Sequence, residues 1–155
     1  MIRAWRIVKA KYQKDAFSGE GAQRYGGRWN SPGTAVVYVA ESRALAALEL
    51  LVHLNASQLL ESYVMIPVDF ADELVRTVDP AALPENWREY PSPPGNKAVG
   101  DAWAARQESV ILALPSAVVE GERIFLINPN HPSFSQLAVG EAESFTFDER
   151  LVKED

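Results

Sequence analysis

The chain of 155 residues contains no cysteine and only two histidines. The lack of cysteine excludes disulfide bonds, thiolate metal ligands and a cysteine nucleophile. It also fits a cytoplasmic location, where disulfides are rare. Two isolated histidines are too few for a metal site of the usual kind, so we expect no metal cofactor.

The sequence also lacks any run of about 18 apolar residues, which a membrane-spanning helix would need. Its first ten residues carry Arg3, Arg6 and Lys9 and have no long apolar stretch, so they do not form a signal peptide. We therefore expect a protein of the cytoplasm that makes no contact with a membrane.

A surplus of positive charge is missing as well. Acidic residues outnumber basic ones by 21 to 15, and the net charge is −6. A general nucleic-acid binder needs many Lys and Arg side chains to displace counterions from phosphates, so we expect no direct nucleic-acid binding. One or two arginines would still suffice for a small anionic ligand. The glycine signatures of Walker and dinucleotide-binding loops are absent too.

The elements expected from the sequence indicate an α+β fold in a single domain, 1–155. Strands outnumber helices and do not alternate regularly with them. Strands are predicted at 2–8, 35–40, 63–69, 74–78, 109–114, 123–128 and 145–147, and helices at 43–54, with Ser42 as N-cap, and at 97–107. Residues 79–96 contain five prolines and are predicted to form a long surface connection.

The segment 17–33 combines five glycines with large polar and aromatic side chains. Such a mixture is poor material for a helix or a central strand and is typical of a loop whose backbone approaches a ligand. Within it, Arg28 offers a planar fork for a phosphate or carboxylate, and Trp29 offers a flat apolar wall. An irregular loop with an ordinary surface arginine is the weaker alternative.

Glu49 is the only charged residue between Ala44 and Val52. On a helix it shares a face with Leu45 and His53, so its carboxylate is predicted to be partly buried or to lie at the rim of a cleft. Burial of an unpartnered carboxylate is costly, which calls for a functional reason. From the helix pattern alone, a glutamate on the solvated stripe of an amphipathic helix is slightly favoured.

For three further candidate residues, the local sequence pattern does not distinguish a site role from a structural one. Tyr38 lies in the apolar run 35–40, where a core tyrosine with a hydrogen-bonded hydroxyl is the simpler reading. Ser116 follows Pro115 at a strand end and by itself is only a turn residue. Ser109 is a weaker candidate for a site serine.

The order of these pieces resembles the RES-domain toxins of RES–Xre type II toxin–antitoxin systems. The resemblance runs along most of the chain and rests on an ordered set of short motifs: Trp5-Arg6, residues 17–22 (FSGEGA), residues 27–30 (GRWN), Gly33, residues 37–40 (VYVA), Leu48-Glu49 through His53, Gly100-Asp101 with Trp103, residues 114–119 (LPSAVV), and residues 126–129 (LINP) with His131-Pro132. One position departs from the family, which often has an asparagine where this chain has Ile124.

The resemblance implies an ADP-ribosyltransferase-like fold, a split β-sheet core with flanking helices. It further implies that NAD is the substrate and that an antitoxin with a helix-turn-helix DNA-binding domain blocks the site. The family's arginine, tyrosine and glutamate correspond to Arg28, Tyr38 and Glu49, and its serine corresponds best to Ser116. With Trp29, these residues form the predicted NAD-binding and catalytic set. A homodimer is an alternative that the sequence leaves open.

The chemistry of NAD cleavage suits such residues. Breaking the nicotinamide–ribose bond develops positive charge on the ribose, as in glycoside cleavage, and a fixed carboxylate such as Glu49 stabilises that charge. The predicted activity is a NAD glycohydrolase or phosphorylase that depletes cellular NAD. A mono-ADP-ribosyltransferase that modifies a cellular protein shares the first half-reaction, and a module that binds a nucleotide without cleaving it is the third alternative.

Overall fold

A curled β-sheet is the framework of the protein in the computed structural model, which describes residues 1–153. Its eight strands within these residues follow the order β4-β5-β6-β2-β1-β3-β7, with β8 also paired to β3. The strands are β1 (Ile2–Lys9), β2 (Val37–Ala40), β3 (Tyr63–Phe70), β4 (Val75–Thr77), β5 (Ile111–Pro115), β6 (Arg123–Ile127), β7 (Ala138–Val139) and β8 (Glu143–Phe145). The helices are α1 (Glu20–Tyr25), α2 (Arg43–Leu51), α3 (Ala56–Leu59) and α4 (Pro94–Arg106), and short 3-10 turns complete the chain. The expected α+β class is confirmed.

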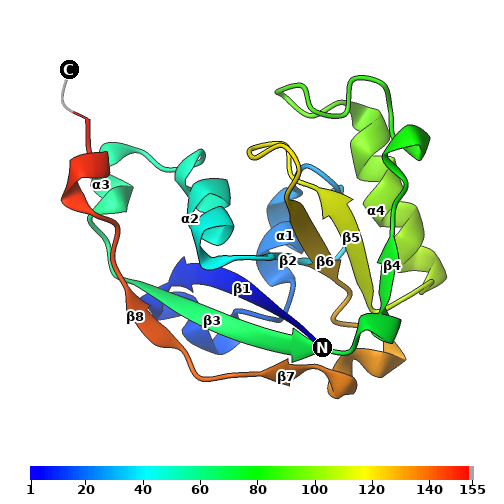
Figure 1. The fold of residues 1–155 in the computed structure, drawn as a ribbon, viewed down its shortest axis with the longest axis horizontal. Coiled ribbons are helices and arrows are strands. Elements are labelled where there is room, and N and C mark those ends of the chain that lie inside the picture. Colours follow the sequence, from blue (N-terminus) through cyan, green and yellow to red (C-terminus); the bar gives the residue numbers. More distant parts are fainter. Residues whose placement is uncertain (154–155) are drawn as a thin grey trace.

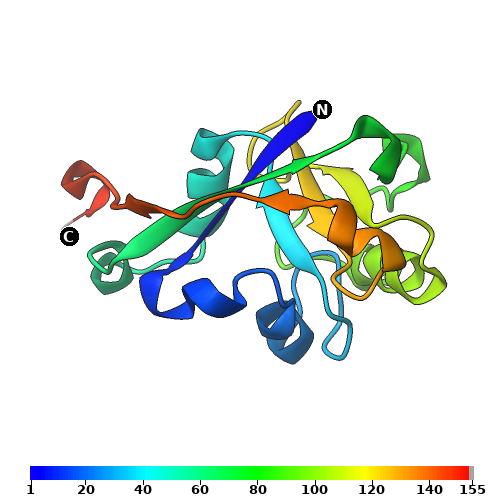
Figure 2. The same ribbon diagram turned by 90° about the horizontal axis from the view of Figure 1, so that it is seen from below.

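The sheet is split between β1 and β2. Strand β1 pairs with β3 along all of its residues, but it pairs with β2 only where Trp5 lies opposite Ala40. The strands on the two sides of this junction therefore diverge, and β3 crosses β2 and β6 at a wide angle (Figures 1 and 2). The split core expected from the family resemblance is present.

Arg6 occupies the split just beyond the junction. Its Nη1 donates to the backbone oxygen of Tyr38 at 2.9 Å, and its Nε donates to the backbone oxygen of Ala16. At Tyr38 the guanidinium thus takes over a hydrogen bond that a continuous strand ladder would make. Burial lowers the pKa of Arg6 to about 10, because desolvation disfavours the charged form.

Helices α2 and α4 pack on the same face of the sheet, α2 over β1 and β2 and α4 over β5 and β6 (Figure 1). Leu45 of α2 and Trp103 of α4 are both buried in this main hydrophobic cluster. Ser42 caps α2 as predicted, since its hydroxyl accepts from the backbone N–H of Leu45 at 3.1 Å. The face between these two helices is where the candidate residues converge.

The prediction of a helix-free segment at 17–33 was wrong, because α1 lies within it. Glu20 and Arg24 form an i,i+4 ion pair of 2.9 Å on this short helix, an interaction that supports helical structure. The irregular part is confined to the residues that follow, and Gly27 and Asn30 are bridged there in a tight turn. This turn carries Arg28 at its tip.

Other boundaries shifted by a few residues. Helix α2 ends at Leu51 rather than at residue 54, and the short helix α3 was not predicted. Helix α4 begins at Pro94, three residues before the expected start, because a proline fits the first turn of a helix, where no N–H partner is needed. The last strand, β8, is Glu143–Phe145 rather than 145–147.

Candidate active site

The carboxylate of Glu49 and the hydroxyl of Ser116 are hydrogen-bonded. Ser116 Oγ donates to Glu49 Oε1 at 2.7 Å, although the two residues are 67 positions apart in sequence. Ser116 is 1% exposed, and its hydroxyl also accepts from the backbone N–H groups of Val118 and Val119 at 3.1 and 3.0 Å. The serine is thereby held in one orientation and holds the half-buried Glu49 in turn.

The side chain of Tyr38 connects strand β2 to the turn at 27–30. Its hydroxyl donates to Asn30 Oδ1 at 2.6 Å and accepts from the backbone N–H of Trp29 at 3.1 Å. A Cβ on Gly27 would lie 2.6 Å from the same hydroxyl, so a glycine is needed for this close approach. Burial raises the pKa of Tyr38 well above its ordinary value. The protonated phenol thus donates one hydrogen bond and accepts another.

Arg28 projects from this turn towards the proline-rich connection. Its Nη1 donates to the backbone oxygens of Trp87 and Glu89 at 3.0 and 2.9 Å. Both bonds use a single nitrogen of the guanidinium, whose five N–H groups form a fixed fork. The Nε and Nη2 edge makes no hydrogen bond to the described residues, which leaves it able to receive an anion.

Trp29 does not form the exposed wall that the sequence predicts. Its side chain is completely buried and packs in the main cluster, with its ring centroid 6.1 Å from that of Trp87. Of these two neighbours in the turn, only Arg28 is partly exposed. Trp29 therefore serves the site by anchoring the turn.

The structure separates the two candidate serines. Ser109 precedes β5, where its hydroxyl accepts from Trp103 Nε1 at 2.8 Å and donates to the backbone oxygen of Ile111 at 2.7 Å. Ser116 follows the other end of the same strand, about 20 Å away by strand geometry. Only Ser116 meets Glu49, so the arrangement favours it over Ser109.

Two residues that the sequence did not single out for a site role support the candidates. Asn30 is fully buried, and its Nδ2 donates to the backbone oxygens of Ala22 and Thr34 at 2.9 and 3.1 Å. Arg88 donates from Nε to the backbone oxygen of Ala117 at 3.1 Å, next to Ser116. The only sequence signal for Asn30 is its place beside Trp29 in the GRWN motif.

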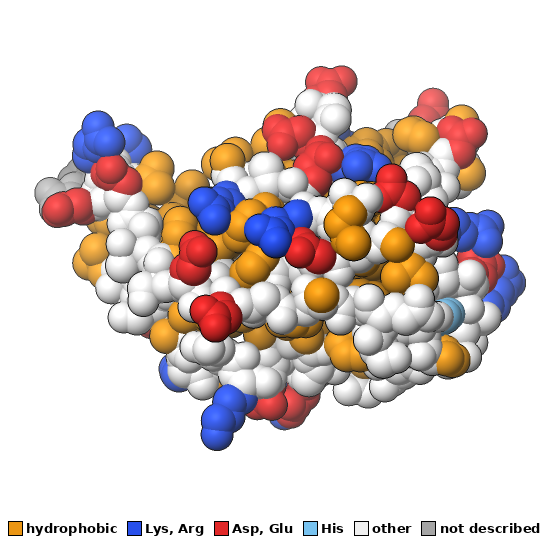
Figure 3. All heavy atoms as spheres, turned by 60° about the horizontal axis from the view of Figure 1, so that its bottom comes forward, with side chains coloured by type: hydrophobic (Ala, Val, Ile, Leu, Met, Phe, Trp, Pro, Cys, Tyr) orange, Lys and Arg blue, Asp and Glu red, His pale blue; other side chains and the backbone are white. Residues whose placement is uncertain are grey.

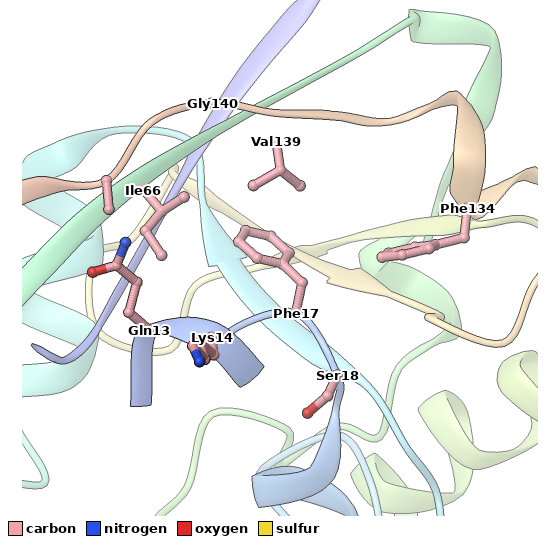
Figure 4. A pocket seen from close by; sticks show the side chains of 9 residues that line it. Gln13, Lys14, Phe17, Ser18, Ile66, Phe134, Val139 and Gly140 are labelled. Carbon is pink, nitrogen blue, oxygen red and sulfur yellow. The ribbon is translucent and has the colours of Figure 1, made fainter. Parts of the chain in front are cut away.

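A hollow of about 460 Å³ lies on the side of β3 that faces away from α2 and the main hydrophobic cluster (Figure 4). It contains none of the candidate residues and no carboxylate, and its lining consists of Gln13, Lys14, Phe17, Ser18, Ile66, Phe134, Val139, Gly140 and Ala142.

Charges of both signs are intermixed on the face drawn in Figure 3. Within residues 1–153 no cluster of three potential metal ligands occurs, and none of the helices described there could span a membrane.

The comparison with known families decides what kind of domain carries this arrangement. A family model described as the RES domain matches residues 3–148. The chain belongs to the RES-domain family. The matched range includes every candidate residue from Arg28 to Ser116, so the RES domain and the candidate site coincide.

Curated relatives of this RES domain match along nearly their whole length. "Toxin Res" of Yersinia enterocolitica is 38% identical over 148 residues, covering 95% of this chain and 97% of the relative. "Prs ADP-ribosylating toxin" of a Sphingobium species is 36% identical over 154 residues, covering 96% of each. A solved structure, the MbcT–MbcA toxin–antitoxin complex of M. tuberculosis, has a chain with a TM-score of 0.75 and 24% identity, covering 94% of this chain and 84% of that one. This likeness supports the fold.

Proposed function

We propose that this RES domain is a toxin that cleaves NAD between nicotinamide and ribose, in the cytoplasm. The observation that carries the proposal is the 2.7 Å bond between Ser116 and Glu49. It fixes a carboxylate on the same face of the sheet as Tyr38 and the turn bearing Arg28. The curated names of two relatives, a toxin and an ADP-ribosylating toxin, agree with it.

In the proposed reaction the bond between ribose C1′ and the nicotinamide nitrogen breaks, and both electrons leave with nicotinamide. The leaving group departs neutral, so no strong general acid is needed. Glu49 stabilises the cationic ribose, and Ser116 orients Glu49. Arg28 binds a phosphate of NAD through its open edge. Water or inorganic phosphate then adds at C1′ and releases a proton.

Transfer of ADP-ribose to a macromolecule is the second candidate function. The name of the Sphingobium relative, an ADP-ribosylating toxin, favours it. Both reactions share the cleavage step and differ only in the acceptor. Product analysis identifies the acceptor.

One experiment distinguishes the alternatives. Purified protein is incubated with labelled NAD under three conditions: in buffer, in buffer with inorganic phosphate, and in a cell extract. The products are separated by chromatography and identified by mass. ADP-ribose indicates hydrolysis, a phosphorylated ADP-ribose indicates phosphorolysis, and label on protein in a cell extract indicates transfer. NAD that is bound but stays intact in all three conditions would refute cleavage.

A toxin of this kind must be held inactive by a partner. We propose a separate antitoxin with a helix-turn-helix DNA-binding domain, which blocks the site by presenting a carboxylate to Arg28 in place of the NAD phosphate. A complex formed by the solved structural neighbour agrees with such a partner. The test is competition: NAD and antitoxin should exclude each other, and Arg28→Ala should weaken the complex.

A further inference from the structure

Helix α4 holds both ends of the turn that carries Arg28. Lys97 Nζ donates to the backbone oxygen of Gly27 at 2.6 Å. One helical turn later, Asp101 Oδ1 accepts from the backbone N–H of Ser31 at 2.9 Å. Residues four apart lie on the same helix face, so one face of α4 grips the turn immediately before and soon after Arg28.

The helix also touches the middle of the turn and the far end of the arginine. A Cβ on Gly100 would lie only 1.9 Å from the backbone oxygen of Trp29, so α4 and the turn are in direct backbone contact. Asn96 Nδ2 donates at 2.7 Å to the Trp87 oxygen that also accepts from Arg28. Contacts with α4 therefore hold both the backbone on either side of Arg28 and the Trp87 oxygen that its guanidinium binds.

The Lys97 contact is made by a charged donor. A bond from an ammonium to a carbonyl is stronger than one between neutral groups, and Lys97 forms no ion pair within residues 1–153. Burial alone would raise the pKa of Asp101, but hydrogen bonds from Ser31 and Thr34, with the charge of Lys97, outweigh it and lower that pKa. The Asp101 carboxylate is therefore ionised at neutral pH.

We propose that Lys97 is a positioning residue for Arg28. By holding the carbonyl immediately before Arg28, it keeps the open edge of the guanidinium aimed at the anionic ligand. The inference rests on the proposed function in one respect, since the ligand is then a phosphate of NAD.

The first test separates affinity from turnover. Lys97→Met keeps the apolar stem and removes the donor, and it should raise the KM for NAD about tenfold while kcat stays within about twofold. Lys97→Arg, which restores a charged donor, should recover most of the affinity. Arg106→Met removes the same charge from the end of the same helix, where the side chain is 73% exposed, and should leave KM unchanged. An unaltered KM in Lys97→Met overturns the proposal.

The second test is a double-mutant cycle. If Lys97 acts through Arg28, then Lys97→Met should have no further effect on NAD affinity, measured by calorimetry, once Arg28 is replaced by alanine. Effects that multiply would mean that Lys97 contacts the ligand itself, and they would overturn the positioning role.

The third test does not depend on activity. Amide hydrogen exchange in residues 27–31 should be at least about tenfold faster in Lys97→Met than in the wild type, and unchanged in Arg106→Met. Unchanged exchange in Lys97→Met overturns this inference. Faster exchange in a protein that fails to bind NAD refutes the proposed function alone. Lys97→Ala, which also removes the donor, provides the same comparison if the methionine variant does not fold.

Discussion

Replacement of Ser116 by alanine tests the core of the proposed site. The change removes the hydrogen bond to Glu49 and deprives two backbone N–H groups of their acceptor. Because the turn at 117–119 is half-exposed, water replaces part of the loss, and we expect about 1–3 kcal/mol less stability. This corresponds to a melting temperature lower by roughly 3–10 °C. Loss of a charge-assisted bond of about 1.5–3 kcal/mol should slow NAD cleavage roughly 10- to 150-fold.

Ser109→Ala is the matched control, since the Ser109 hydroxyl also makes two short hydrogen bonds. Its removal should cost a similar amount of stability, measured by thermal denaturation, and leave the cleavage rate per folded molecule unchanged. The assay follows nicotinamide release well below both melting temperatures. Equal rate losses in the two variants, or a wild-type rate in Ser116→Ala, would refute the reasoning.

Three further predictions concern the other site residues. Glu49→Gln keeps the shape of the side chain and should lower NAD cleavage by at least about 100-fold at an unchanged melting temperature, and near-normal turnover would contradict its role. Arg28→Lys keeps the charge but loses the fork, so NAD affinity measured by calorimetry should fall about tenfold or more, and an unchanged affinity would show that Arg28 does not touch NAD. Tyr38→Phe should lower the free energy of unfolding, measured in denaturant, by about 1–3 kcal/mol. The reason is that the backbone N–H of Trp29 and the side-chain oxygen of Asn30 lose their hydrogen-bond partner. The raised pKa of Tyr38 means that folding favours the protonated phenol, so this contribution is complete below the ordinary pKa of 10.0 and is lost as the pH rises through the higher folded value. The stability difference should therefore narrow above pH 10, and a constant difference would contradict the assignment.

Much of the fold followed from local patterns. The alternation in β1, the apolar run of β2 and the cap at Ser42 were visible because each depends on residues close in sequence. The errors occurred where local signals were short or mixed. Helix α1 was hidden among glycines, and α3 spans only four residues.

The site was predictable only in part. The family resemblance brought Arg28, Tyr38, Glu49 and Ser116 together as candidates, but the burial of Trp29 could not be read from a motif. A tryptophan between an arginine and an asparagine can face either way in a loop. Its direction was decided by packing against Trp87 and the main cluster.

The sequence by itself determined the type of most elements, the acidic charge, the absence of cysteine chemistry and the family pattern, because these are properties of single residues or of near neighbours. The tertiary structure decided which groups meet. Ser109 and Ser116 are both strand-end serines with hydrogen-bonded hydroxyls, and nothing local distinguishes them. Only the packing of α2 against the sheet brings Glu49 within 2.7 Å of Ser116. Likewise, only the close approach of α4 at Gly100 places Lys97 on the carbonyl before Arg28, since contacts across 67 to 70 positions depend on the whole chain being folded.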